Sequence, residues 1–264
     1  MSESNKKIAM ITGASSGLGA VYADRLARRG YDLILVARRA DRLKALAETI
    51  AATHGRQVEV IAADLEKEAD LTRVEAALSN PDLDMLVNNA GLARFAPIAT
   101  GSVQDSLSQI ALNITALTRL THAVLPGFAQ RDRGVLINVG SVLGIHAMAS
   151  SSVYSGTKGF VLNFTRGLQK EFADTGVRVQ LVAPASTATE VWDNSGIPLE
   201  ALNPSAVMTI ENCVDAALAG LDAGEDVTWP SVADHTLWDR FDAARAELFA
   251  STQTGKPAPR YAIA

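Results

Sequence analysis

Short apolar, β-branched runs alternate along the chain with longer segments in which apolar residues recur every three or four positions. The short runs predict buried strands, and the longer segments predict amphipathic helices. This alternation is typical of βαβ units, which build a parallel sheet covered by helices on both faces. We therefore expect an α/β fold with a doubly wound parallel sheet. The seven expected strands span residues 8–12, 32–37, 58–63, 85–88, 135–139, 177–182 and 227–229.

Helical periodicity is strongest over residues 40–54, 104–124 and 152–173. It fails over residues 185–208, where prolines and glycine interrupt the chain. Long irregular segments of this kind often cover a binding site. We therefore expect residues 185–208 to form a substrate lid.

The last part of the chain predicts a helix over residues 233–250 and a C-terminal tail over residues 251–264. The tail contains two prolines and a glycine and has no period. Two alternatives stay open for it: disorder, or a position on a neighbouring subunit. Neither an internal repeat nor a break in composition marks a second domain, so we expect residues 1–264 to form a single domain.

The composition indicates a globular protein rather than one that binds nucleic acid. Of the 264 residues, 48% are hydrophobic and 20% are charged, which excludes a disordered chain. The 29 acidic and 24 basic residues leave a net charge of -5, so nucleic acid is not an expected partner. The single cysteine, Cys213, cannot form an intramolecular disulfide, and no histidine and cysteine cluster predicts a metal site. Without a signal-like or membrane-spanning segment, we expect a cytoplasmic protein.

A glycine-rich turn joins the first strand to the helix that follows it. Such a turn exposes backbone N–H groups at a helix N-terminus, where glycine lets a pyrophosphate approach. The spacing is GxxxGxG rather than the commoner GxGxxG, and the alternative is a turn that only permits tight packing. In a Rossmann-like fold, the predicted cofactor-binding residues of this turn are Gly13, Ser15, Ser16, Gly17, Leu18 and Gly19.

Two arginines follow the second strand, at a position where a dinucleotide fold that selects NAD usually carries an acid. Here the strand ends in Ala37, Arg38 and Arg39. A guanidinium group can pair in bidentate fashion with a 2′-phosphate, which favours NADP(H) over NAD(H). The alternative is that both arginines are ordinary charges beside a helix.

The third and fourth strands also end in residues suited to a ligand, because ligands of open α/β sheets bind beyond the carboxyl ends of the strands. Asp64 could accept a hydrogen bond from an adenine amino group, and the turn after Asn89 would let the backbone approach a ribose. Each motif taken alone is more often an ordinary turn. The predicted contacts are Asp64, Leu65, Asn89, Ala90 and Gly91.

The reactive groups follow the fifth strand. Tyr154 comes 13 residues after Ser141, and Lys158 stands one helical turn further on. A phenol is a poor acid near neutral pH, but a neighbouring cation stabilises the phenolate and lowers the pKa. We therefore expect Tyr154 to exchange a proton with a carbonyl or hydroxyl group. A Tyr-x-x-x-Lys pair on its own is commonly a solvated helix surface.

With the motifs TGxxxGxG, NNAG, Ser and YxxxK in this order, the sequence resembles the short-chain dehydrogenase/reductase family over residues 6–190. The resemblance implies that Tyr154 is the general acid or base, that Lys158 holds the nicotinamide ribose, and that Ser141 binds the substrate oxygen. It also implies that Asn113 joins a water relay to the lysine. The alternative for Asn113 is a polar residue on an exposed helix face.

One position departs from the pattern of that family. The family usually carries Pro-Gly after the sixth strand, whereas this chain has Pro184 and Ala185. Alanine adopts positive φ less readily than glycine, so the backbone here need not follow the family. The resemblance implies cofactor contacts at Thr187 and Thr189, with Thr189 holding the carboxamide.

Apolar side chains in the lid and near the strand ends predict an apolar substrate pocket, although some of them could instead pack the lid. No Lys or Arg occurs over residues 184–209, so coenzyme A lacks an obvious partner there. Arg94 could hold a substrate carboxylate or be a surface residue. The pocket candidates are Phe95, Leu143, Ile145, Trp192, Ile197, Pro198, Leu199 and Leu202.

Together these residues predict an NADPH-dependent carbonyl reductase or alcohol dehydrogenase that acts on a ketone, an aldehyde or a secondary alcohol, in either direction. The alternative is a protein that binds NADP as a sensor without catalysis, which the absence of Tyr154 or Lys158 would favour. The helices expected at 104–124 and 152–173 are apolar over a broad face, and in the resembling family they form the subunit interface. We therefore expect a homodimer or homotetramer.

Overall fold

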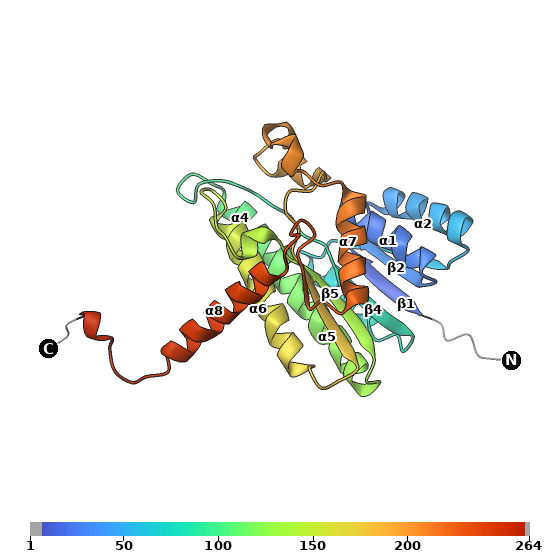
Figure 1. Cartoon of the computed structure of the whole chain (residues 1–264). Coiled ribbons are helices and arrows are strands. Elements are labelled where there is room, and N and C mark those ends of the chain that lie inside the picture. The colour runs from blue at the N-terminus through green and yellow to red at the C-terminus, as the bar shows by residue number, and fades with distance from the viewer. Residues whose placement is uncertain (1–6, 262–264) are drawn as a thin grey trace. The chain divides into compact units, whose positions relative to one another are not determined.

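Seven parallel strands form one sheet in the order β3-β2-β1-β4-β5-β6-β7, and helices cover both of its faces (Figure 1). The computed structural model describes residues 7–261. The winding reverses between β1 and β4, as in a doubly wound sheet. The predicted Rossmann-like fold is confirmed, and the sheet with the helices that cover it forms a single domain. The strands are β1 (Ile8–Thr12), β2 (Asp32–Ala37), β3 (Val58–Ala62), β4 (Leu83–Asn88), β5 (Gly134–Val139), β6 (Val177–Val182) and β7 (Val227–Thr228).

The helices largely follow the predicted periodicity, with three differences. The segment expected as one helix over residues 104–124 contains a π-helix, Ala111–Ala116, between two α-helices. Two further helices, α3 and α7, were not predicted. The apolar period of α3 is weak, whereas α7 repeats apolar residues every three or four positions from Cys213 to Leu221, so this signal was missed. The helices are α1 (Gly17–Arg28), α2 (Ala40–His54), α3 (Glu68–Ala77), α4 (Val103–Ile110), α5 (Leu117–Gln130), α6 (Ser152–Glu171), α7 (Ile210–Ala223) and α8 (Thr236–Ser251).

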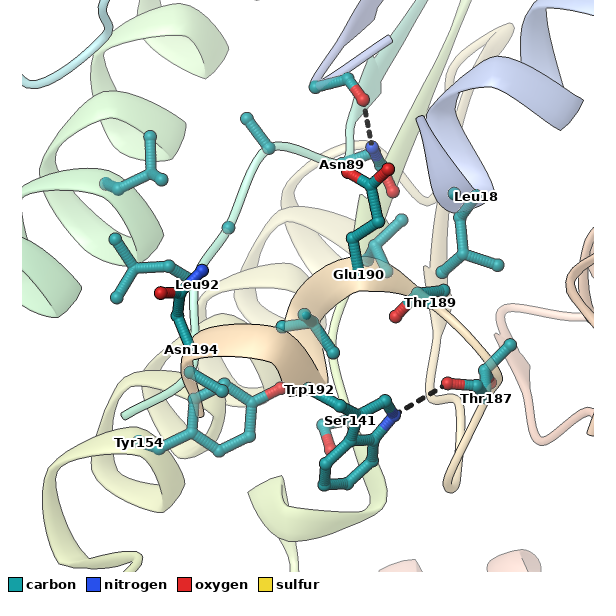
Figure 2. Close-up of a pocket in the computed structure, with 18 of the residues that line it drawn as sticks. Leu18, Asn89, Leu92, Ser141, Tyr154, Thr187, Thr189, Glu190, Trp192 and Asn194 are labelled. Carbon is teal, nitrogen blue, oxygen red and sulfur yellow. Dashed lines mark hydrogen bonds between the residues drawn. The ribbon is translucent and has the colours of Figure 1, made fainter. Parts of the chain in front are cut away.

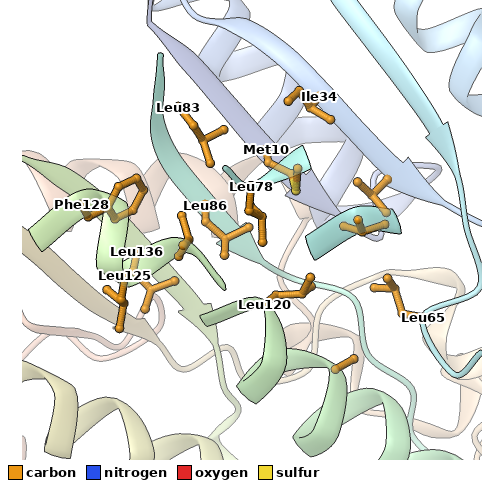
Figure 3. Close-up of a cluster of buried hydrophobic side chains, with 14 of the residues drawn as sticks. Met10, Ile34, Leu65, Leu78, Leu83, Leu86, Leu120, Leu125, Phe128 and Leu136 are labelled. Atoms are coloured by element: carbon orange, nitrogen blue, oxygen red, sulfur yellow. The ribbon is translucent and has the colours of Figure 1, made fainter. Parts of the chain in front are cut away.

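Each face of the sheet has its own layer of buried apolar side chains. Because side chains alternate along a strand, Met10 of β1 lies in one layer and Ile11 in the other. The first layer packs α3, α5 and α6 against the sheet, and Figure 3 shows Phe128 of α5 beside Leu86 and Leu136 in it. The second layer packs α1, α2 and α7. Burying each large side chain stabilises the fold by about 1.5–3 kcal/mol, which explains why the strands are apolar on both faces.

The segment expected as a lid, residues 185–208, is largely irregular and contains three short 3₁₀ helices, Glu190–Asn194, Leu199–Ala201 and Pro204–Ala206. Its two ends are joined by a β-bridge between Thr187 and Met208. The lid is also tied to the segment after β4, because the Ser195 carbonyl accepts a hydrogen bond of 2.6 Å from the Phe95 amide.

The contacts of the chain divide it into two compact units, one that ends at Ser231 and one that begins at Val232. The second unit contains α8, which begins at Thr236 rather than at residue 233, and a 3₁₀ turn over Pro259–Tyr261. The last three residues of the expected tail, 262–264, lie outside the described part of the chain. No helix among residues 7–261 is long and apolar enough to cross a membrane.

Candidate active site

A cavity of about 880 Å³ opens at the carboxyl ends of the strands (Figure 2). This volume lies within the range of about 300–1,000 Å³ that small-molecule and cofactor sites occupy. Of the predicted catalytic and cofactor-binding residues, Gly19 and Asn113 do not line the cavity, and all the others do. The predicted residues in its wall are Gly13, Ser15, Ser16, Gly17, Leu18, Arg38, Arg39, Asp64, Leu65, Asn89, Ala90, Gly91, Ser141, Tyr154, Lys158, Thr187 and Thr189.

The glycine-rich turn between β1 and α1 combines both roles that its sequence allows. Gly17 lines the cavity with φ of +57°, and Gly13 does so with φ of +68°, conformations that favour glycine. Gly19 instead serves packing, since a Cβ there would collide with the Gly13 carbonyl and lie 2.7 Å from Nδ2 of Asn89. The turn therefore needs glycine for backbone shape at the cavity and for close contact with the chain after β4.

Thr12, at the end of β1, connects the turn to the segment after β4 and was missed as a site residue. Its hydroxyl accepts hydrogen bonds of 3.0 Å from the amides of Asn89 and Ala90 and donates to the Val87 carbonyl. Asn89 returns a bond from Nδ2 to the Thr12 carbonyl at 2.9 Å. A threonine directly before the first glycine was the available signal. The two strand ends at the switch point are thus held in one geometry.

The start of α1 suits an anion. Ser16 precedes the helix, but its side chain does not cap it, and no acidic residue occurs in the first turn. The backbone N–H groups there and the positive end of the helix dipole can therefore serve a bound pyrophosphate. The predicted dinucleotide fits this part of the cavity.

Arg39 lies between the glycine-rich turn and the lid, and it is not simply a solvated charge. Its Nη2 donates to the hydroxyls of Ser15 and Ser16 at 3.0 and 2.7 Å, and its Nη1 donates to Glu190 at 2.7 Å. Arg38 also lines the cavity and is exposed. The sequence therefore placed both arginines correctly at the cavity wall.

Two charged residues at this end of the cavity were missed. Glu190, in the lid, also accepts from Nη1 of Arg42 at 2.5 Å. The hydrogen bonds from Arg42 and Arg39 hold the pKa of Glu190 at about 2, so it is an anion throughout the neutral range. Arg42 follows Arg39 at a spacing of three on α2, which was a usable signal, whereas nothing local marks Glu190.

Tyr154, in the first turn of α6, has an environment that differs from the expectation in one respect. Burial raises the pKa of its hydroxyl to about 12, although a hydrogen bond from Ser141 acts in the opposite direction. The expected lowering of the Tyr154 pKa by the cation of Lys158 is not found, and desolvation of the phenolate dominates instead. Ser141 Oγ itself accepts from the Leu143 amide at 3.1 Å, which orients the hydroxyl. As a phenol at neutral pH, Tyr154 is a proton donor.

Lys158 is buried, with 7% of its surface exposed, so the solvated-surface alternative for the Tyr-x-x-x-Lys pair is wrong. Its Nζ donates to the Val139 carbonyl at 2.8 Å and lies 5.8 Å from the centre of the Tyr154 ring. Burial lowers the pKa of Lys158 to about 8, so it is mostly protonated at pH 7. An ammonium group has three donors, which leaves capacity for a ribose beside the Val139 contact.

Asn113 lies within the π-helix and is buried, so the exposed-face alternative is wrong. Its Oδ1 accepts from the Leu92 amide and its Nδ2 donates to the Leu92 carbonyl, both at 2.9 Å. Nδ2 also donates to Thr157 Oγ1 at 3.1 Å. One turn earlier, Gln109 accepts from the Arg94 amide at 3.0 Å. These two amide side chains fix the segment that leads from Gly91 past the cavity.

An aromatic wall faces the reactive groups. The Phe95 ring lies edge-on to Tyr154 with centroids 5.4 Å apart, and 6.2 Å from the ring of Trp192. Trp192 is held in place by a hydrogen bond of 2.8 Å from Nε1 to the Thr187 carbonyl (Figure 2). The predicted residues Leu143, Ile197, Leu202 and Arg94 also line the cavity.

Three predicted pocket residues do not line the cavity. Ile145 is exposed, and Pro198 and Leu199 lie at the start of the second 3₁₀ helix of the lid. Periodicity cannot assign side-chain direction in an irregular segment, and for Pro198 and Leu199 the alternative of lid packing stays open. Ala185, at the usual glycine position, has no positive φ, since the non-glycine residues with positive φ among residues 7–261 are Asp132 and Ser150. The backbone there does not require glycine.

A sequence profile described as short chain dehydrogenase matches residues 7–198. This match covers more than half of the chain. The protein belongs to the short-chain dehydrogenase/reductase family, whose members are NAD(P)-dependent oxidoreductases acting on CH–OH and C=O groups.

Solved structures similar to this chain extend over nearly its whole length. A short-chain dehydrogenase from Sphingobium yanoikuyae in complex with NADPH has 43% identity and a TM-score of 0.92, covering 96% of this chain and 98% of the other. A bulky-bulky ketone specific alcohol dehydrogenase from Comamonas testosteroni has 37% identity and a TM-score of 0.89, covering 98% of this chain and 99% of the other.

Curated relatives match a shorter part. The 17-beta-hydroxysteroid dehydrogenase type 3 of Rattus norvegicus is 35% identical over 183 residues, which are 69% of this chain and 60% of that protein. The very-long-chain 3-oxoacyl-CoA reductase-A of Danio rerio is 33% identical over 189 residues, 70% of this chain and 59% of that protein. The chain thus spans about three fifths of the length of these relatives.

Proposed function

We propose that this protein is an NADP(H)-dependent carbonyl reductase or alcohol dehydrogenase with Tyr154 as general acid or base. The single observation that carries the proposal is the phenol of Tyr154 in the cavity wall, hydrogen-bonded to Ser141 and close to the buried Lys158. A protein that only senses NADP would not need a buried proton donor beside a buried cation. We therefore favour catalysis over the sensor alternative.

The chain's own residues would carry the proton. Ser141 orients the substrate oxygen beside the Tyr154 hydroxyl, which donates its proton as the oxygen gains charge during reduction. Lys158 then stabilises the resulting phenolate through its positive charge. When bound, the nicotinamide supplies a hydride to the carbonyl carbon, or accepts one from the alcohol.

Several parts of the cavity wall would hold NADP(H). The backbone at Gly17 and the start of α1 would bind the pyrophosphate, and Arg38 and Arg39 the 2′-phosphate. Lys158 would bind the nicotinamide ribose. The NADPH complex of the Sphingobium relative supports this choice of cofactor. The further proposed contacts are Asp64, Leu65, Asn89, Ala90, Gly91, Thr187 and Thr189.

We further propose a ketone with bulky apolar groups as the substrate. Phe95 and Trp192 form an aromatic wall next to Tyr154, and such a surface binds an apolar group better than a charged one. The Comamonas relative, described as specific for bulky-bulky ketones, supports the same class. Since the lid carries no Lys or Arg over residues 184–209, a coenzyme A thioester is a weaker candidate.

The test is NADPH consumption with a panel of ketones that range from small aliphatic to diaryl compounds. We expect turnover with the bulky members, and a rate at least about 10²-fold lower in Tyr154→Phe. A wild-type protein that binds NADPH but reduces no carbonyl, and oxidises no alcohol with NADP⁺, would contradict catalysis and favour the sensor.

We also propose a homodimer or homotetramer. Val103, Leu107 and Ile110 of α4 are exposed by 73%, 52% and 40%, and the latter two lie in the predicted subunit helix over residues 104–124. Burying such a stripe in a symmetric interface would remove it from water. Light scattering at micromolar concentration should give at least twice the chain mass of 27.9 kDa, and a monomer mass would contradict the proposal.

A further inference from the structure

Glu190 connects the lid to the arginines proposed for the 2′-phosphate. It is the first residue of the first 3₁₀ helix in the lid. Its Oε2 accepts from Arg39 at 2.7 Å, and its Oε1 accepts from Arg42 at 2.5 Å. The two carboxylate oxygens thus hold two different guanidinium groups.

Arg39 cannot serve Glu190 and an incoming phosphate independently. Its Nε and Nη2 are directed at Ser15 and Ser16 of the glycine-rich turn, and its Nη1 at Glu190. A phosphate that binds this guanidinium group would have to displace the carboxylate or lie beside it. Two anions at one guanidinium repel each other.

The difference in charge between the two anions favours displacement of the Glu190 carboxylate from Arg39 by the phosphate. A phosphate group carries a charge of about −1.5 to −2 near pH 7, and a carboxylate carries −1. The side chains of Arg39 and Glu190 are both 43% exposed, so their ion pair is weak. The low pKa of Glu190, about 2, means that protonation does not remove this competitor at any working pH.

We propose that Glu190 is a specificity-determining residue of the cofactor site, whose carboxylate competes with the 2′-phosphate of the dinucleotide for Arg39. The competition rests on the proposed function, because it requires the 2′-phosphate to bind at Arg39. Arg42 retains the displaced carboxylate through Oε1. The lid therefore loses its contact with Arg39 when the dinucleotide carries a 2′-phosphate, and keeps it when a 2′-hydroxyl is present.

The effect of removing the Glu190 carboxylate on NADP⁺ binding would have the opposite direction if Glu190 only positioned Arg39 for the phosphate. Removing the carboxylate would then weaken binding of NADP⁺. The two roles are therefore separated by the direction of one change. Glu200 supplies a matched control, since it is also an exposed lid carboxylate but does not line the cavity.

The experiment measures binding of NADP⁺ and NAD⁺ by calorimetry at low salt, without substrate. The two ligands differ only in the 2′-phosphate. We expect Glu190→Gln to lower the Kd of NADP⁺ about threefold to tenfold and to leave that of NAD⁺ within about twofold. Glu200→Gln should change neither, and the effect should shrink at high salt. An unchanged or higher Kd of NADP⁺ in Glu190→Gln would overturn the competition.

Arg39→Ala separates this outcome from failure of the proposed cofactor site. If Arg39→Ala weakens NADP⁺ while Glu190→Gln has no effect, the competition is wrong and the phosphate site stands. If Arg39→Ala leaves NADP⁺ binding unchanged, the proposed phosphate site is wrong, and the competition falls with it.

Hydrogen exchange gives a second readout. In the wild type, NADP⁺ should increase exchange over residues 190–195 relative to NAD⁺, and in Glu190→Gln the two ligands should give the same exchange. Equal exchange with both ligands in the wild type would contradict a change of lid contact.

Discussion

The two ends of the cavity use charge in opposite ways. At the reactive end, Lys158 and Asn113 are 7% and 1% exposed, and each is bonded to backbone groups. At the phosphate end, Arg39 and Glu190 are each 43% exposed and bonded to side chains. Buried polar groups are costly to leave unpaired, whereas exposed ion pairs exchange partners at small cost. The residues proposed for catalysis are therefore held rigidly, and those proposed to select the cofactor can exchange partners.

The sharpest test of the rigid end is Tyr154→Phe. The substitution keeps the ring against Phe95 and removes only the hydroxyl. Since general acid catalysis contributes about 10²- to 10⁴-fold, kcat should fall by at least that order, while NADPH still binds. Steady-state rates and cofactor titration by fluorescence measure both quantities. Tyr31→Phe, outside the cavity wall, is the control, and a Tyr154→Phe enzyme with half the wild-type kcat would refute the mechanism.

Lys158→Met should lower both turnover and cofactor affinity, because one ammonium group supports the phenolate and would bind the ribose. We expect a loss of kcat on the order of 10²-fold. In the wild type, the Lys158 charge is lost as pH rises through its pKa of about 8, so reduction should slow above pH 8. That decline should be absent from the residual activity of Lys158→Met. Lys170→Met, exposed on the same helix, should retain the wild-type profile.

Asn113→Ala tests whether the hydrogen bonds of the buried Asn113 side chain to the Leu92 backbone stabilise the fold. It would leave the amide and carbonyl of Leu92 without their partners. We expect unfolding to become easier by about 3 kcal/mol, a fall of about 10 °C in the melting temperature. Calorimetry measures the change. The exposed Asn212→Ala is the control, and equal melting temperatures for the two variants would contradict a supporting role for Asn113.

The smallest effect should come from the exposed end. Arg38→Asp would place a carboxylate where it repels a 2′-phosphate and can accept from a 2′-hydroxyl. The ratio of the Kd values for NADP⁺ and NAD⁺ should rise about tenfold. Arg56→Asp makes the same charge change outside the cavity wall and should leave the ratio unaltered. If both variants behave alike, Arg38 has no part in selecting the cofactor.

At both ends of the cavity, residues that belong to a local pattern could be predicted from the sequence, since Arg38 and Arg39 follow a strand just as Ser141 does. Strand periodicity and the motifs around Gly13, Asn89 and Tyr154 are local patterns, and the parallel sheet brings the ends of its strands to one edge. Nearly all the predicted residues accordingly meet in one cavity.

What could not be predicted depends on tertiary packing. Glu190 meets Arg39 across 151 positions in the chain, and an exposed glutamate carries no local signature. The high pKa of Tyr154 results from burial, which the Tyr-x-x-x-Lys spacing does not contain. The directions of Ile145 and Leu199 likewise follow from irregular backbone rather than from a period.

The π-helix over Ala111–Ala116 marks a place where the chain could lose one residue without breaking the helix. A π-turn accommodates one residue more than an α-turn, so deleting one residue here would let α4 and α5 continue as a regular helix. Because the wider turn absorbs the extra residue, the side chains of α4 and α5 on either side of it would keep nearly the same directions after the deletion. Gln109, which lies before the π-helix, would stay directed at the Arg94 amide, whereas Asn113 lies within the shortened turn and would move relative to Leu92. A deletion of one residue here should therefore disturb the support of Leu92 and leave that of Arg94 in place.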